Sequence, residues 1–146
     1  MNKIPWEIIR EEIMPYTYMP QPSKLCLDIR SYYNIRDYLF KLYYERWKFS
    51  FEYERNADKN WLENDIMRFM NEDFATMNGY TYSHLKKYER LFVLKDEDPE
   101  IIINYINKHT AIKNNVMSSI NIQLGLLTYE ERHKLVDFVH ELELEL

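Results

Sequence analysis

The chain is poor in the residues that build tight turns and cross-links. Its 146 residues include only two glycines and one cysteine. Two glycines leave few positions for the positive-φ turns that join short strands, so the composition disfavours a hairpin-rich β fold and favours helices. The single cysteine, Cys26, excludes an intrachain disulfide and a zinc site built from several cysteines. A lone cysteine is typical of a reducing compartment.

The chain has neither a net positive charge nor a long apolar run. Its formal net charge is −5, which argues against general nucleic-acid binding because phosphate contacts need a basic surface. Its longest apolar runs are a few residues, far below the roughly 20 that span a bilayer. The N-terminus lacks a basic start followed by an apolar run, so the sequence shows no signal peptide. We therefore expect a soluble cytoplasmic protein that binds neither nucleic acid nor membrane.

Aromatic residues are abundant and concentrated in one stretch. Ten of the 22 residues in 32–53 are aromatic, and neither Gly nor Pro interrupts them. Within this stretch the residues that recur at three- and four-residue steps, and so share one face of a helix, are Ile35, Tyr38, Leu39, Leu42, Tyr43 and Trp47. The pattern predicts a central aromatic-rich helix around which the other helices pack. A surplus of aromatic side chains is also typical of partner surfaces.

Apolar periodicity and capping residues predict further helices along the whole chain. The clearest signal is Thr128 with Glu131 three residues later, a capping box before the last helix. We expect Asn34 to break the chain before the aromatic helix, Gly79 to adopt positive φ, and Gly125 to end a helix. Ser23 and Asp58 are expected helix caps. Together these signals predict one all-α domain over residues 1–146, with six to eight helices. The expected helices are 4–14, one from 23 to about 32, the aromatic helix to 53 and on toward 56, 59–70, 83–94, one from 99 through 106, 110–124 and one from 128 through 142.

The sequence contains no signal for catalysis, a metal or a cofactor. His133 and His140 are seven residues apart, so two helical turns separate them by about 10 Å, too far to share one ion. His84 and His109 lie near helix ends without a visible partner. The chain has neither a nucleophile elbow nor a glycine-rich phosphate loop. We therefore expect a protein that is not an enzyme.

The N-terminus resembles a known interaction motif. Ile4-Pro5-Trp6-Glu7-Ile8 is similar to the Leu-Pro-x-Glu-Ile/Leu opening of the F-box, and the likeness extends loosely over residues 1–45. This resemblance implies docking on Skp1 within a cullin ubiquitin ligase, while the remainder of the chain selects a substrate. Pro before Glu is also what any helix start favours. The residues that the resemblance assigns to partner binding are Ile4, Pro5, Trp6, Ile8, Ile9 and Ile13.

Two hypotheses about function follow. The first is a non-enzymatic protein–protein interaction module of F-box-like type that recruits a substrate. The second is a viral structural or assembly protein that acts through self-association as a homodimer. The N-terminal block also resembles proteins of large DNA viruses of the mimivirus type, which places the protein in the host cytoplasm or the virion.

Overall fold

The protein is helical throughout the part that the structure describes, a computed structural model covering residues 22–50, 55–110 and 115–144. Within these ranges there is no strand, which confirms the all-α prediction. Three short 3₁₀ turns, η2, η3 and η4, occupy Lys48–Ser50, Thr76–Asn78 and Phe92–Leu94. The six described α-helices are α3 (Ser23–Trp47), α4 (Ala57–Met70), α5 (Tyr82–Tyr88), α6 (Pro99–His109), α7 (Val116–Leu126) and α8 (Tyr129–Leu144).

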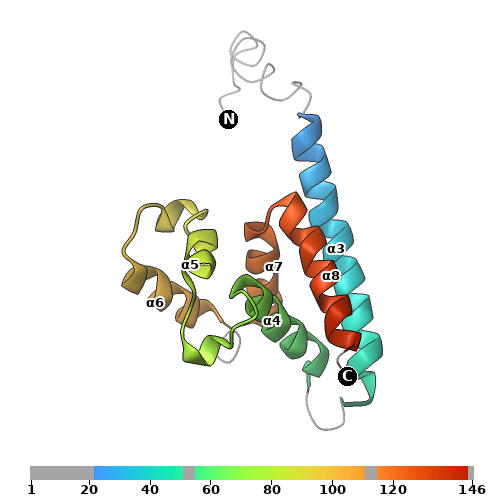
Figure 1. Ribbon diagram of the computed structural model, residues 1–146. Coiled ribbons are helices and arrows are strands. Elements are labelled where there is room, and N and C mark those ends of the chain that lie inside the picture. Colours follow the sequence, from blue (N-terminus) through green and yellow to red (C-terminus); the bar gives the residue numbers. More distant parts are fainter. Residues whose placement is uncertain (1–21, 51–54, 111–114, 145–146) are drawn as a thin grey trace, which may run out of the picture.

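Helices α3 and α8 lie side by side along one edge of the molecule, and α4 and α7 pack against them (Figure 1). Helices α5 and α6 pack on each other at the opposite side, where α5 contacts α4. Helix α4 thus contacts α3, α5, α7 and α8. The expectation that the other helices surround the aromatic helix is not confirmed, because α3 runs along the edge.

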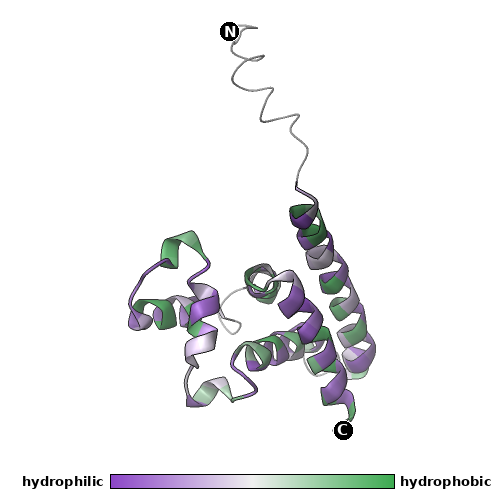
Figure 2. Cartoon of the chain, turned by 45° about the horizontal axis from the view of Figure 1, so that its top comes forward, coloured by the Kyte–Doolittle hydropathy of each residue, from purple (hydrophilic) through white to green (hydrophobic). Residues whose placement is uncertain are grey.

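The long helix α3 contains most of the aromatic stretch. It runs without a break through Asn34, so the expected boundary there is wrong. Asn34 is exposed, and solvent can satisfy its side chain, which removes the reason for a helix to end. The expected cap at Ser23 is also wrong, since Pro22 holds the cap position without a side-chain bond. Hydrophobic and hydrophilic residues alternate along the whole of α3 (Figure 2).

The core forms where α3, α4, α7 and α8 meet. Leu39, Leu62, Ile66, Leu124 and Leu135 are fully buried there. Leu39 and its neighbours Ile35 and Tyr43 follow the predicted four-residue spacing, and the Tyr43 hydroxyl donates to Asp65 on α4. By contrast, Tyr33, Tyr38, Tyr44 and Phe49 are exposed. The predicted inner face is confirmed for Ile35, Leu39 and Tyr43 and is wrong for Tyr38, and many aromatic residues of α3 lie outside the core.

Capping residues fix several helix starts. The Thr128 hydroxyl accepts from the Glu131 amide, and the Glu131 carboxylate accepts from the Thr128 amide, which confirms the capping box. Gly79 has φ of 110°, as expected. Asp58 is not a cap: it lies buried in the first turn of α4, after Asn56. Gly125 does not end a helix, because α7 continues through it to Leu126.

The expected N-terminal helix and its partner-binding residues lie outside the described residues. These are Ile4, Pro5, Trp6, Ile8, Ile9 and Ile13. Among the described helices, none is both long and apolar enough to cross a membrane.

Candidate functional site: an apolar groove

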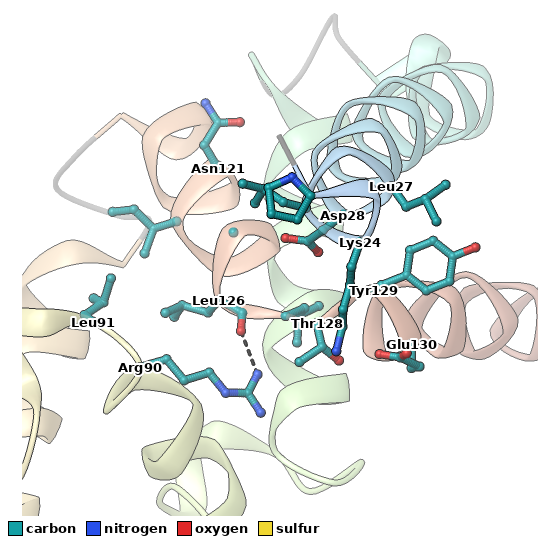
Figure 3. A pocket seen from close by; sticks show the side chains of 15 residues that line it. Lys24, Leu27, Asp28, Arg90, Leu91, Asn121, Leu126, Thr128, Tyr129 and Glu130 are labelled. Atoms are coloured by element: carbon teal, nitrogen blue, oxygen red, sulfur yellow. Dashed lines mark hydrogen bonds between the residues drawn. The ribbon is translucent and has the colours of Figure 1, made fainter. Parts of the chain in front are cut away.

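A groove of about 980 Å³ opens at the N-terminal end of α3. Three segments that are distant in the sequence form it: the first turns of α3, the residues just after α5, and α7 with its junction to α8 (Figure 3). Its apolar lining comes from Leu25, Leu27, Leu91, Ile122, Leu126 and Leu127. We call this feature the α3 groove.

The wall that α3 contributes is apolar and open to solvent. Leu25 and Leu27 line the groove while remaining 41% and 54% exposed. Ile29 and Tyr33 of the same helix are also exposed, at 45% and 51%, but they lie outside the groove lining. Large apolar side chains that are exposed together mark interaction sites more often than isolated ones do. The first turns of α3 therefore present surface that the described helices leave uncovered.

Arg132 of α8 holds together the helices that line the groove. This side chain is only 2% exposed, and it joins three helices. Its guanidinium donates to the Ser31 hydroxyl at 3.2 Å, to the Leu124 carbonyl at 3.1 Å and to the Asp28 carboxylate. The carbonyl belongs to the last turn of α7, where carbonyls lack intrahelical partners. Sequence reasoning missed Arg132, since nothing in its neighbours marks it as buried.

The opposite wall is held by a second arginine. Arg90, just after α5, donates to the Leu126 carbonyl at 2.6 Å (Figure 3). It also donates to the Glu131 carboxylate at 2.6 Å. Burial raises the pKa of Glu131, but the hydrogen bonds from Arg90 and Thr128 outweigh this and hold it below the ordinary value. One carboxylate thus supports both the start of α8 and the wall of the groove.

Gly125 leaves the middle of the groove open. It lies on the exposed face of α7 within the groove lining, and a Cβ built on it meets no heavy atom within 4 Å. Glycine inside a helix costs roughly 0.5–1 kcal/mol relative to alanine. No contact with another part of the structure explains this cost. A bound helix that approaches the backbone of α7 closely would explain it.

A second polar cluster is buried under α5 and serves the fold. His84 is fully buried, its Nδ1 lies 3.2 Å from Asn71 Oδ1, and its ring stacks on Tyr88. Burial, with a smaller effect of Lys87, lowers the pKa of His84 to about 4. Asn71 also donates to the carbonyls of Phe74 and Gly79. The expectation that His84 lacks a partner is wrong; together with Asn71 it holds the loop before α5.

The other histidines take part in surface contacts. The His140 ring lies 2.8 Å from the Tyr38 hydroxyl, and His133 packs on Tyr129. His109 packs on Tyr105, so it too has a partner that sequence reasoning missed. Within residues 22–50, 55–110 and 115–144, no group of three or more His, Cys, Asp or Glu residues is placed to hold a metal ion. The α3 groove, and not the histidines, therefore remains the candidate binding site in the described part of the chain.

Comparison with known proteins does not extend this description. No family model, no curated protein and no solved structure matches the chain.

Proposed function

We propose that the protein is a non-enzymatic protein–protein interaction module and that the α3 groove binds an amphipathic helix of its partner. The observation that carries this proposal is the uncovered apolar wall of α3 facing the α7–α8 junction across an open groove. Amphipathic helices dock into grooves of this kind through apolar residues at positions i, i+3, i+4 and i+7.

The groove rim favours a helix with charged residues beside its apolar stripe. Lys24 lies on the α3 side and Glu130 on the α8 side. Neither forms an ion pair with another residue in the described part of the chain. Charges at the rim of an interface fix orientation more than they add affinity. The partner helix is thus expected to carry both signs of charge.

The test is a selection of short peptides from a random library against the full chain. Binders should carry apolar residues at helical spacing, and Leu27→Asp should weaken their binding at least tenfold. Ile29→Asp is the matched control, because Ile29 is similarly exposed on the same helix and does not line the groove. Gly125→Phe, which places a ring in the groove, should weaken binding as Leu27→Asp does. Binders that ignore both groove variants would contradict the proposal.

The F-box-like form of this function is more specific, and the N-terminal sequence pattern supports it. In this form Ile4, Pro5, Trp6, Ile8, Ile9 and Ile13 contact a Skp1-like adaptor. Light scattering on a sizing column, with purified Skp1, would reveal a 1:1 complex. Ile4→Asp combined with Ile8→Asp should abolish that complex; a complex that survives the double substitution would rule out this form.

Self-association is the alternative, and one observation favours it. Trp61 stacks on Trp47 with ring centroids 4.8 Å apart, while Trp61 remains 42% exposed and Phe49 is 82% exposed. Aromatic residues of this kind are enriched in interfaces. If a homodimer forms through this surface, Trp61→Ala should lower the mass measured in solution to that of a monomer. A strictly monomeric mass well above micromolar concentration would count against it.

A further inference from the structure

We propose that the Tyr38 hydroxyl is an acyl-acceptor site, at which the His140 imidazole takes the hydroxyl proton while the oxygen attacks an activated acyl donor such as a thioester or an acyl phosphate. This inference goes beyond the proposed function, because neither residue lines the α3 groove. The two residues come from α3 and α8, which pack side by side (Figure 1). Each chain is modified once, so the reaction is a modification of the protein and not an enzymatic turnover.

Four side chains from these two helices form a continuous series of polar contacts. The Tyr38 hydroxyl lies 2.8 Å from Nε2 of His140. The other ring nitrogen, Nδ1, lies 3.5 Å from one carboxylate oxygen of Glu143. Arg46 of α3 donates to the second oxygen of that carboxylate at 2.8 Å. Hydroxyl, imidazole and carboxylate thus stand in the order of nucleophile, base and orienting acid that nucleophilic catalysis uses.

The contacts determine which nitrogen of the imidazole can receive a proton. A carboxylate only accepts hydrogen bonds, so the neutral ring carries its proton on Nδ1, which faces Glu143. Nε2 then accepts from the Tyr38 hydroxyl. The hydrogen bond from Arg46 holds the pKa of Glu143 below its usual range, so the carboxylate keeps its charge and favours this tautomer. Glu143 is therefore a positioning residue for His140.

The site is open to a reagent from solvent. Tyr38 is 43% exposed, and the side chains of His140 and Glu143 are 44% and 39% exposed. Polar pairs as exposed as these contribute little to stability, so packing of the core does not require the arrangement. An acyl donor can reach the Tyr38 oxygen without any movement of the helices.

The chemical step follows from these positions. As the Tyr38 oxygen bonds to the acyl carbon, its proton passes to Nε2 of His140 and the bond from the acyl carbon to the leaving group breaks. His140 then gives the proton to the leaving group, so the imidazole is neutral again and Tyr38 carries an ester. A tyrosine ordinarily ionises near pH 10, so at neutral pH its attack depends on such a base. A general base contributes roughly 100- to 10,000-fold to a reaction of this kind.

Acetylation of the full chain by N-acetylimidazole at neutral pH, followed by peptide mass spectrometry, tests the site. Tyr33 is the matched control in the same molecule, because it lies on the same helix, is 51% exposed and has Arg36 over its ring. We expect Tyr38 to be acetylated at least tenfold faster than Tyr33. Equal rates at the two tyrosines, or faster acetylation of Tyr33, would overturn the inference.

Variants and pH distinguish proton transfer from simple exposure. His140→Gln should lower the rate at Tyr38 to within about twofold of Tyr33, whereas His133→Gln, an exposed histidine on the same helix, should leave it unchanged. Near pH 10 the advantage of native Tyr38 should fall below about threefold, because tyrosines ionise there without a base. An advantage that survives His140→Gln, or one that is as large near pH 10, would contradict the role of His140.

The positioning role of Glu143 has its own measurement. Glu143→Gln should slow acetylation of Tyr38 about threefold or more at neutral pH and leave the rate near pH 10 unchanged, because the phenolate needs no base there. Slowing by the same factor at both pH values would show that the substitution disturbs the local structure, which contradicts the positioning role. An unchanged rate at neutral pH would contradict it as well.

Discussion

Gly125 lies at a position where a helix gains stability from almost any other residue. It is exposed within α7 and has open space above its Cα. We expect Gly125→Ala to raise the free energy of unfolding by about 0.5–1 kcal/mol, because alanine restricts the unfolded chain and favours helix. Urea denaturation followed by circular dichroism measures this difference. A loss of stability would mean that the backbone at Gly125 requires glycine for its own conformation.

Arg132 has the opposite character, since its charge is buried and shared among three helices. Arg132→Ala removes the donors to Leu124 and Ser31 and leaves the Asp28 carboxylate unpaired. Because Asp28 remains 44% exposed, water compensates part of the loss, and we expect destabilisation of about 2–3 kcal/mol. Lys134→Ala, on the exposed face of α8, is the matched control and should change stability by less than about 0.5 kcal/mol. Equal effects of the two variants would contradict the structural role of Arg132.

His84 links stability to pH. The unfolded chain binds a proton at His84 near pH 6.5, whereas the folded protein binds it only near pH 4. The unfolded state therefore holds more protons between these values, so the free energy of unfolding decreases as the pH falls from 6.5 toward 4. The full difference is on the order of 3 kcal/mol. Denaturation at a series of pH values should show this decrease.

Two variants separate the effect of His84 on stability from the effect of carboxylates that bind protons in the same pH range. His84→Gln should flatten the pH dependence of stability between pH 4 and 6.5, whereas His133→Gln, at an exposed position, should not. A slope that is the same in native protein and His84→Gln would show that His84 does not titrate below its ordinary range. The buried contact with Asn71 would then need another explanation.

At the scale of elements, helix α3 has two different halves. Leu39 is fully buried against α4 and α8, whereas Leu27 is 54% exposed beside the groove. We expect Leu39→Ala to destabilise the protein by roughly 2–5 kcal/mol, the usual cost of a core cavity. Leu27→Ala should cost less than about 1 kcal/mol. Chemical denaturation compares the two; similar costs would mean that the first turns of α3 are as firmly packed as the rest.

Local signals predicted some element boundaries well. The capping box at Thr128 and Glu131 and the positive φ of Gly79 follow from contacts within a few residues, and the sequence contains both partners. Asn34 and Gly125 were interpreted as boundaries because their types often end helices. In the structure, packing of the flanking residues on α3 and α7 overrides that preference.

The groove itself was beyond sequence reasoning. Its walls come from residues near 25, near 90 and near 125, and nothing local shows that these segments meet. The same holds for Arg132, whose partner Asp28 is distant in the chain. Leu25 and Leu27 are exposed in the groove, whereas the sequence shows only that they are apolar. The spacing of apolar residues shows which face of a helix is buried but not which element packs against it.

At the scale of the whole molecule, the described helices form a closed core on one side and an uncovered groove on the other. The core explains why the chain folds, and it uses residues of α3, α4, α7 and α8. Leu126 and Leu127 belong both to that core and to the groove lining, whereas Leu25 and Leu27 remain exposed in the groove. The proposed interaction module would explain why Leu25 and Leu27 are left uncovered.

The most direct measurement is the affinity of one library-selected helical peptide for three forms of the full chain: native, Leu27→Asp and Ile29→Asp. Isothermal titration calorimetry gives the three dissociation constants under the same conditions. We expect Leu27→Asp to weaken binding at least tenfold, equivalent to about 1.4 kcal/mol, and Ile29→Asp to leave it within twofold. Equal affinities for the two variants would contradict the claim that the α3 groove is the binding site.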